Sequence, residues 1–271
     1  MVKNTFIRWI GGKEWLWKHI KPYLISDHHE IYIEPFLGGG AIAIHYIKWC
    51  RKHNIPKQFI LSDSNAGLIN AYIQIRDHCE ELIDYLHELD RTKGTKTIYM
   101  ERRRLYNEID KNSVRSAGLF IWLMANGWRG LYRVNKRNEY NAPFGTARKQ
   151  CYSSENLRSL HDLFENVEFR CCAFHEVKEH GLIYLDPPYE NTYQNYSLNA
   201  PTNEEINKFI SDHRDQSSIY VSNNQYYTPP HDSKLVIHMN ICNKVKMHSD
   251  LTREEYVWKV RGSLEGVVLR G

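Results

Sequence analysis

The sequence lacks the long apolar segments that a membrane protein requires. No stretch approaches the roughly 18 consecutive apolar residues of a membrane span. Residues 1–5 also lead straight into mixed polar sequence, without the apolar core of a secretory signal. We therefore expect a cytoplasmic protein with no membrane partner.

Paired cysteine motifs are missing as well. The six cysteines include no C-x-x-C pair, and the adjacent Cys171 and Cys172 have poor geometry for a disulfide bridge. Cys50 and His53 have the spacing of two metal ligands, but no second pair completes a tetrahedral set. The sequence therefore predicts free thiols in a reducing compartment and no metal site.

The chain has little net charge, +4 over 271 residues, with 42% hydrophobic and 25% charged residues. These values exclude disorder, collagen and coiled coil, and they allow one large domain or two. The charge is nevertheless uneven. Between Arg91 and Lys149, 14 basic residues face only four acids, so this segment carries +10 and the remainder −6. A solvated face is one explanation, but the interleaved Trp128 and Tyr132 favour a surface for nucleic acid.

Alternating strand and helix patterns flank this basic segment. Strands are predicted at 31–36, 58–61, 167–171, 182–185, 218–221, 235–238 and 256–258. Helices are predicted at 41–49, 68–89, 156–164 and 203–213, the last with a capping box of Thr202 and Glu205. This alternation predicts an α/β fold with a mostly parallel sheet covered on both faces.

The basic segment itself has a different pattern of predicted secondary structure. Residues 96–126 are predicted as helices without a strand, and residues 132–144 as a hairpin with a polar tip at 135–138. We interpret this region as an inserted module. The predicted domains are a discontinuous core of residues 1–64 and 152–271 and an insert of residues 65–151.

A glycine turn follows the first predicted strand. Gly38 to Gly40 let the backbone approach a ligand closely, and the next helix presents unpaired N–H groups. Residues 38–43 satisfy G-x-G-x-x-A, and Asp63 lies at the interval expected of an acid that binds ribose hydroxyls. The pattern indicates an adenosine-type ligand. The alternative is a turn that serves only tight packing of strand and helix.

The tetrad Asp186-Pro187-Pro188-Tyr189 directly follows the predicted buried strand 182–185. In open parallel sheets, ligands bind beyond the carboxyl ends of the strands. The paired prolines hold the Asp186 carboxylate, the Pro187 carbonyl and the Tyr189 ring in a fixed relation. Two such acceptors could each take one N–H of a nucleobase amine, whose lone pair is otherwise delocalised, and thereby free that lone pair. The aromatic ring offers a surface on which a base could stack.

Several motifs together resemble one family. The tetrad, the F-x-G-x-G turn at 36–40, the W-x-G-G-K run at 9–13 and the pair Ser222-Asn223 are similar to the DNA adenine methyltransferase (Dam-type) family. Residues 126–135 and 141–145 resemble that family's recognition hairpin. The resemblance extends over essentially the whole chain. It implies a Rossmann-like core that uses S-adenosylmethionine, with an inserted helical and β-hairpin domain that recognises DNA.

The resemblance also implies roles for individual residues. It places the cofactor against Trp9, Gly12, Lys13, Phe36, Gly38, Gly40, Asp63 and Asp186. It makes Asp186 and Pro187 the amine acceptors and Tyr189 the stacking partner of an extruded adenine, with no metal required. It assigns duplex-DNA contacts to Arg8, Arg129, Leu131, Arg133, Asn135 and Pro143. We expect a monomer or a weak dimer on DNA.

The recognition hairpin departs from the family at one informative place. Arg129 stands where members commonly carry Asn, whereas Leu131 and Arg133 match the members that read GATC. Because arginine is the commonest reader of guanine, GATC is the leading predicted target.

Other functions fit parts of the sequence. The tetrad alone also suits a cytosine-N4 or an RNA adenine methyltransferase, because these targets also present an exocyclic amine. A catalytically silent DNA-binding regulator derived from such an enzyme is a further alternative. The glycine turn alone would suit a dehydrogenase, for which a segment of +10 has no use.

Overall fold

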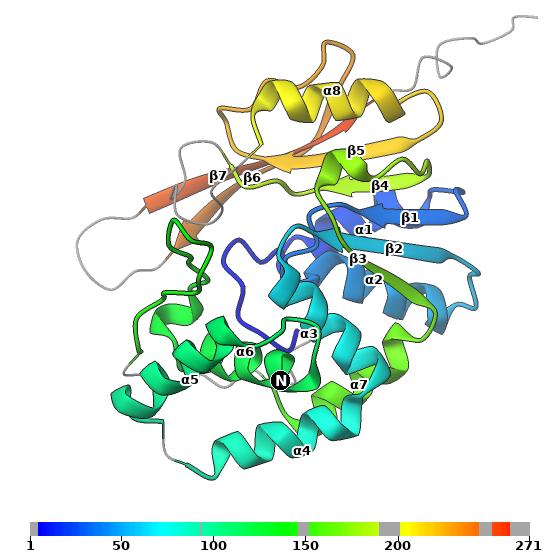
Figure 1. Ribbon diagram of the computed structural model, residues 1–271. Helices are drawn as coiled ribbons and strands as arrows, with labels where there is room; N and C mark the ends of the chain where they lie inside the picture. Colours follow the sequence, from blue (N-terminus) through cyan, green and yellow to red (C-terminus); the bar gives the residue numbers. More distant parts are fainter. Residues whose placement is uncertain (1–4, 93, 146–151, 190–200, 244–250, 261–271) are drawn as a thin grey trace, which may run out of the picture.

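The computed structural model describes residues 5–92, 94–145, 152–189, 201–243 and 251–260. Seven strands form one sheet, with helices on both faces and the helical insert at one side (Figure 1). The strands are β1 (Ile31–Glu34), β2 (Gln58–Asp63), β3 (Val167–Cys171), β4 (Leu182–Leu185), β5 (Ser218–Asn223), β6 (Lys234–Asn243) and β7 (Leu251–Val260). Their order in the sheet is β3-β2-β1-β4-β5-β7-β6.

The first five strands are parallel, and β7 pairs antiparallel with both β5 and β6. The prediction of a mostly parallel α/β sheet is therefore confirmed. Because β1, β2, β4 and β5 run in one direction, their carboxyl ends meet at one edge of the sheet. The glycine turn after β1 and the tetrad after β4 start from this edge.

Eight helices and two short 3₁₀ turns occur in the described ranges. They are α1 (Trp17–Ile25), α2 (Ala41–Lys52), α3 (Ala66–Asp77), α4 (Cys79–Asp90), α5 (Lys96–Glu108), α6 (Val114–Asn126), η1 (Trp128–Gly130), α7 (Ser154–Phe164), η2 (Phe174–Glu176) and α8 (Asn203–His213). None of these helices has the length and apolar character needed to cross a bilayer.

The predicted helix 68–89 is wrong in one respect, because it is two helices that break at His78. The backbone of His78 leaves helical geometry, with φ −137° and ψ 42°. Helix α3 lies against β2 and β3 as well as against α6 and α7, whereas α4 lies against α6 and α7. A single straight helix could not follow both surfaces, so tertiary packing overrides the continuous apolar pattern.

Alternate side chains along each strand point to opposite faces of the sheet and contribute to two hydrophobic layers. Ile33, Ile183 and Ile219 pack with Phe209 of α8 in one cluster. The other cluster covers the opposite face and contains Tyr32, together with buried residues of α1, α2, α3, α4 and α6. This second cluster runs without interruption from the sheet into the insert. The helices of the predicted insert are therefore packed onto the sheet and its helices rather than tethered to them.

The predicted hairpin 132–144 forms antiparallel arms without a regular strand. Val134 bridges Tyr140, and Asn141 N–H donates to the Arg133 carbonyl at 2.8 Å. Helix α5 holds one arm, since Asn107 exchanges two hydrogen bonds with the backbone of Tyr140. This arm of the hairpin therefore has a fixed place beside α5.

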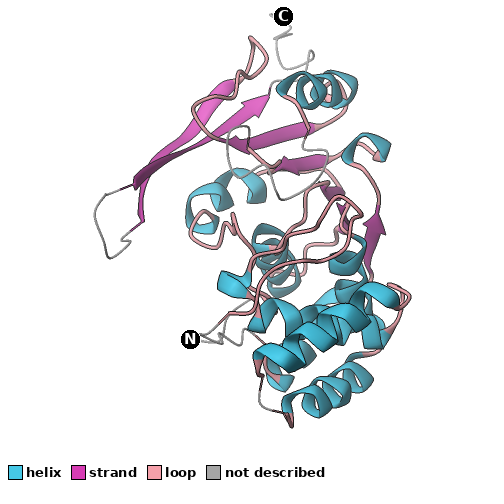
Figure 2. Cartoon of the chain, turned by 60° about the vertical axis from the view of Figure 1, so that its left-hand side comes forward, coloured by secondary structure: helices cyan, strands magenta, loops and turns pink. Residues whose placement is uncertain are grey.

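The β6–β7 ribbon extends past the rest of the sheet (Figure 2). Strand β5 pairs with β7 only from Tyr256 to Val260, and its last pair joins Asn223 to Tyr256. The preceding residue of β7, Glu255, thus lies where the ribbon leaves β5, close to the edge at which β4 and β5 end.

Candidate active site and nucleic-acid interface

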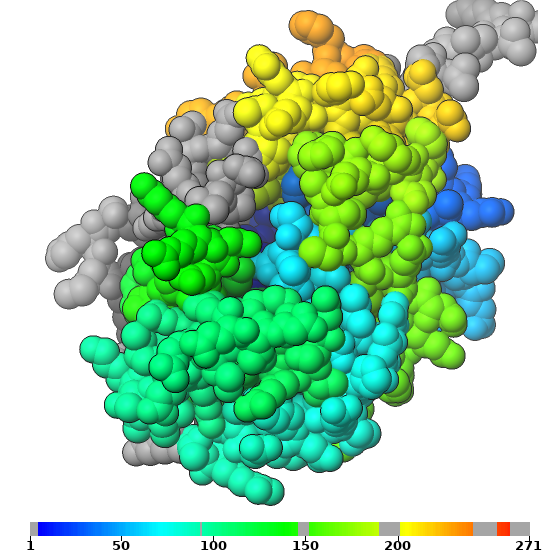
Figure 3. Space-filling view, in the orientation of Figure 1, coloured from blue at the N-terminus to red at the C-terminus, as the bar shows by residue number. Residues whose placement is uncertain are grey.

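The tetrad follows β4 directly, and β4 lies between β1 and β5. The Asp186 side chain is 19% exposed, Pro187 is buried and Pro188 is exposed. In the space-filling view, cyan residues lie between the green insert and the yellow-green chain, and blue residues are visible in small patches behind them (Figure 3). The N-terminal segment contacts both parts, since Trp9 stacks on Tyr132 and Lys13 lies 2.8 Å from Asp186.

Lys13 enters the site from this N-terminal segment. Its ammonium lies 2.8 Å from Asp186 Oδ1, 3.6 Å from Glu255 Oε1 and 4.8 Å from the centre of the Tyr189 ring. It also donates to the Gly11 carbonyl at 3.1 Å. Lys13 is 4% exposed, so its charge is held almost entirely by these partners.

The hydroxyl of Tyr189 joins three side chains. It donates to Glu255 and lies 3.2 Å from Asp186 Oδ1 and 3.4 Å from Ser222 Oγ. Ser222 also donates to Glu255 at 2.5 Å. Burial, reinforced by the charge of Asp186, raises the pKa of Tyr189 well above its usual value, so this phenol stays protonated.

Glu255 is a site residue that the sequence analysis missed. Burial raises the pKa of its carboxyl, while Lys13 lowers it in part. One feature of the sequence could have identified Glu255. It is an acidic residue directly before the apolar run 256–258, at a position of the strand whose side chain faces inward. Only the sheet order reveals its partners, because β7 is 66 residues from Tyr189 in the chain.

The glycine turn is tied to the end of β2. Gly38 and Gly40 have φ of +49° and +66°, which favours glycine at both positions. The Asp63 carboxylate accepts the Gly38 N–H and the Asn65 N–H, both at 2.9 Å. Tyr72 of α3 donates to the Gly38 carbonyl at 3.1 Å. The turn is thus rigid before any ligand binds.

Trp9 and Phe36 lie on different sides of this turn. A Cβ added to Gly38 would meet the Trp9 ring at 2.9 Å, so only glycine allows Trp9 to lie this close. Trp9 also stacks on Tyr132 of the insert, with ring centres 5.8 Å apart. Phe36 instead stacks on Phe174 of η2. Gly12 is exposed in the loop between Trp9 and Lys13.

These residues fit S-adenosylmethionine by their chemistry. The open glycine turn permits close approach of a ligand, and Asp63 keeps lone pairs for ribose hydroxyls beyond its two backbone bonds. The carboxylates of Asp186 and Glu255 bring negative charge to the region, which suits a ligand with a sulfonium and an amino group. The buried Glu34 lies in the same region. Tyr32 donates to Glu34 at 2.7 Å, and burial raises the pKa of this carboxyl.

We expect Gly40→Ala to weaken binding of S-adenosylmethionine by about tenfold or more, because positive φ strains alanine by ~1–2 kcal/mol and the methyl also displaces a neighbour. The added Cβ would lie 2.5 Å from the Tyr72 hydroxyl. Calorimetric titration measures the affinity. Combining the change with Tyr72→Phe should restore part of the loss, since the obstructing oxygen is removed. Unchanged affinity in Gly40→Ala would contradict a role for this turn.

Arg133, a predicted DNA reader, is held by the opposite arm of the hairpin. Its Nε donates to Asn141 Oδ1 at 2.8 Å, and its Nη2 donates to the Asn141 carbonyl at 2.9 Å. Asn135 forms the tip instead: its amide donates to Glu139, and its Oδ1 accepts the N–H groups of Arg137 and Glu139. The hairpin thus fixes the direction of the Arg133 guanidinium.

The other predicted readers surround η1. Arg129 is exposed at φ +57°, with its guanidinium 4.7 Å from the centre of the Trp128 ring. Arg8 lies against Gly130, where an added Cβ would meet its side chain at 3.1 Å. Leu131 is half-buried and Pro143 is exposed. The structure thus brings N-terminal and insert residues together at one surface.

Only part of the positive charge faces solvent. Arg102 donates to the Leu89 carbonyl and lies 4.1 Å from the Trp122 ring, and Arg103 donates to the Ala142 carbonyl. Among the described residues of the insert, the exposed basic residues are Arg91, Lys96, Arg104, Arg115, Arg129, Lys136 and Arg137, and Arg133 is half-buried. These described residues offer positive charge to a polyanion.

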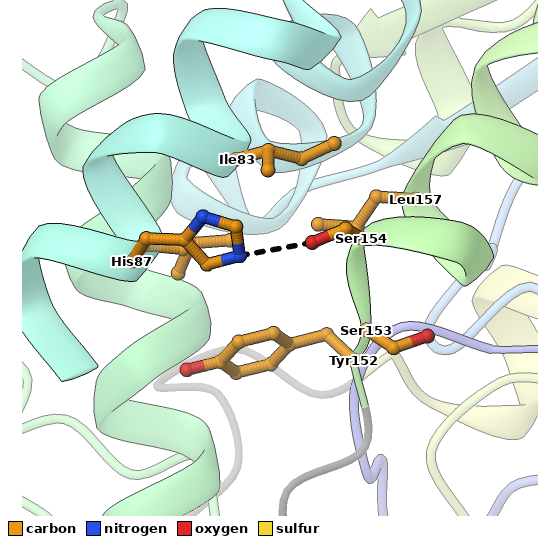
Figure 4. A pocket seen from close by; sticks show the side chains of 7 residues that line it. Ile83, His87, Tyr152, Ser153, Ser154 and Leu157 are labelled. Atoms are coloured by element: carbon orange, nitrogen blue, oxygen red, sulfur yellow. Dashed lines mark hydrogen bonds between the residues drawn. The ribbon is translucent and has the colours of Figure 1, made fainter.

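A cavity of about 240 Å³ lies elsewhere, between α4 and α7 (Figure 4). His87 and Ser154 form a 2.9 Å hydrogen bond at its side. The lining residues are Ile83, Leu86, His87, Tyr152, Ser153, Ser154 and Leu157. None of them belongs to the predicted site.

Comparison with known proteins decides the family. The model of the D12 class N6 adenine-specific DNA methyltransferases matches residues 9–250. The chain belongs to this family. It is 31% identical to Type II methyltransferase M.MjaIII of Methanocaldococcus jannaschii over 224 residues, 76% of each chain. It is 30% identical to Type II methyltransferase M1.LlaDCHI of Lactococcus lactis over 74% of this chain and 71% of that protein. It is 29% identical to the DNA adenine methylase of Escherichia coli K12 over 70% and 66%.

Membership of the family confirms the predicted class of enzyme, an adenine-specific DNA methyltransferase, and with it the methyltransferase fold. The family implies S-adenosylmethionine as methyl donor and DNA as substrate. Within the described ranges, no three His, Cys, Asp or Glu side chains are grouped as metal ligands would be.

Proposed function

We propose that this enzyme methylates N6 of an adenine that has been rotated out of duplex DNA, at a short site of the GATC type. The observation that carries the proposal is the Asp186 carboxylate, which lies at the end of β4 between Lys13 and Tyr189. Strand β4 ends beside the glycine turn of β1, so acceptor and cofactor residues share one edge.

Asp186 and Pro187 would accept the two hydrogens of the adenine amine. Hydrogen bonds to one charged and one neutral acceptor draw the nitrogen toward tetrahedral geometry and make its lone pair available. S-adenosylmethionine supplies an electrophilic methyl group on its sulfonium. Trp9, Asp63 and the glycines at 38 and 40 would hold this donor. Asp186 acts as an acceptor and stabilises developing positive charge.

Tyr189 would form the stacking surface for the adenine. Its ring is 6% exposed, and its hydroxyl is anchored by Glu255 and Ser222. The anchored hydroxyl fixes the plane of the ring. Lys13 lies over this ring, so binding of a base to that face requires the ammonium to move. Rotating the base out of the helix costs a few kcal/mol, which stacking and the amine contacts offset.

Arg133 would read one guanine of the target. Two of its nitrogens are already bound to Asn141, yet the outer Nη1–Nη2 edge keeps hydrogens for the paired acceptors of guanine. An arginine that is oriented in advance loses less conformational entropy when it binds. Arg133 would be flanked by the other proposed readers, which are Arg8, Arg129, Leu131 and Pro143.

We expect Arg133→Ala to lower discrimination at one base pair by about 1–3 kcal/mol, because the paired contacts to guanine are lost. Affinity for random duplex should fall much less. Lys96→Ala, an exposed charge on α5, serves as the control and should weaken all duplexes alike. Competition binding to GATC duplexes with single substitutions measures both effects. Equal losses on specific and random DNA would remove Arg133 from base reading.

The central experiment sequences DNA for N6-methyladenine after expression of the protein in a host that lacks this modification. We expect methylated adenine at one short motif. Methylation of cytosine would favour the N4 alternative. Absence of both products, together with no binding of S-adenosylmethionine, would favour the silent DNA-binding regulator.

A further inference from the structure

Glu255 is a buried acid whose negative charge has no role in the proposed chemistry, where it only anchors the hydroxyl of Tyr189. It is 0% exposed, and it lies beyond residues 9–250, the part that the family model matches. Carboxylates are rarely buried unless a partner compensates for their lost hydration. A charge at this position of a strand therefore calls for an explanation.

The groups around Glu255 come from every neighbouring element. Lys13 approaches from the N-terminal segment, Asp186 and Tyr189 follow β4, and Tyr184 lies within β4. Ser222 of β5 donates to it at 2.5 Å. Lys13 is the one cation among these described groups, so two carboxylates, Asp186 and Glu255, share one ammonium.

The position of Lys13 conflicts with binding of substrate. Its ammonium is 2.8 Å from Asp186 Oδ1, on the carboxylate that the adenine amine needs, and it covers the Tyr189 ring. An amine can bind Oδ1, and a base can stack on the covered face of Tyr189, only if Lys13 moves. A buried ammonium without a partner is strongly unfavourable. Glu255 Oε1, already within 3.6 Å, offers the second carboxylate that this movement requires.

We propose that Glu255 is a positioning residue of the methyl-transfer site, which takes over the Lys13 ammonium when the adenine amine binds Asp186 and which anchors the hydroxyl of Tyr189. This inference rests on the proposed role of Asp186 as amine acceptor. Glu255 itself touches neither the base nor the methyl donor. The negative charge of Glu255 determines how readily Asp186 exchanges the Lys13 ammonium for the adenine amine.

The kinetic test compares Glu255→Gln with Glu255→Asp. We expect Glu255→Gln to lower kcat by about 100-fold with little change in KM, because Lys13 then stays on Asp186. Glu255→Asp keeps the charge and should retain more turnover. A merely structural role predicts the reverse, since glutamine has the length of glutamate. Glu254→Gln is the matched control: Glu254 accepts from Tyr256 on the other face of β7 and should keep the rate.

The pH dependence gives an independent readout. Burial raises the pKa of Glu255, so the carboxylate is lost as the pH falls through this raised value. We expect kcat of the natural enzyme to decline toward acid, starting above the usual range of glutamate. Folded Glu255→Gln, checked by its Tm, should lack this decline. Natural turnover and an unchanged acid limb in that variant would overturn the proposal.

A measurement without turnover separates this inference from the proposed function. If the natural enzyme transfers no methyl group to adenine, the proposed function fails. Carbon NMR titration of the Glu255 carboxyl still reports its pairing with Lys13. We expect Lys13→Met to raise the pKa of Glu255 further, because Lys13 lowers it in the natural protein. An identical titration in both proteins would refute the exchange of Lys13 between carboxylates.

Discussion

Asp186→Asn should reduce the rate of methyl transfer by about 10³-fold or more, the largest effect on activity that we expect. Asparagine keeps the size of the side chain but removes the charge, and its amide can present a donor to the adenine amine. Lys13 retains Glu255 as a partner at 3.6 Å, so the site should keep its shape. Single-turnover transfer of a labelled methyl group measures the rate.

Binding of S-adenosylmethionine should weaken far less than the rate falls in Asp186→Asn, because one acidic group near the sulfonium is lost but the glycine turn and Asp63 are unchanged. Calorimetry separates this from a loss of donor binding. Asp212→Asn is a suitable control, since Asp212 forms an exposed pair with Lys208 on α8. Turnover in Asp186→Asn equal to that of the control would exclude Asp186 from the reaction.

Trp122→Ala should lower the free energy of unfolding by about 3–5 kcal/mol, the largest effect on stability that we expect. Trp122 of α6 is fully buried within the hydrophobic cluster that joins the insert to the sheet. Its loss also removes the ring on which Arg102 lies, 4.1 Å from the ring centre. Urea denaturation monitored by circular dichroism measures the change.

The insert offers a matched tryptophan for comparison. Trp128 is 46% exposed, so Trp128→Ala should change the free energy of unfolding by no more than about 0.5 kcal/mol. Separate unfolding transitions in Trp122→Ala, one for the insert and one for the core, would contradict the continuous packing of the two parts.

Much of the fold could be predicted because its signals are local. The strand, glycine turn and helix around Gly38 to Gly40 depend on neighbouring residues, as does the capping box of Thr202 and Glu205. The break at His78 depends instead on which surfaces α3 and α4 meet. The domain boundaries at residues 64 and 152 stay predictions, although α3 lies against both β2 and the insert helix α6.

The candidate site likewise contains some features that local sequence predicts and others that depend on tertiary contacts. Residue type and spacing are enough to recognise the tetrad, the glycine turn and the W-x-G-G-K run in the sequence. The pairing of Lys13 with Asp186 and Glu255 joins three distant segments, so no local pattern contains it. The charge count also includes Arg102 and Arg103, which are only partly exposed and donate to backbone carbonyls. Composition counts charges but cannot locate their partners.

The attachment of the proposed recognition hairpin to α5 limits how its specificity could be altered. Tyr99, Arg103 and Asn107 bind the backbone of the 140–142 arm, and Tyr99 in turn packs near Trp122. A hairpin grafted from a relative with another target would lose these supports. Transplanting α5, α6 and the hairpin as one block should preserve the orientation of Arg133, the proposed reader of guanine. Exchanging the loop alone should yield an enzyme that binds DNA without choosing among sequences.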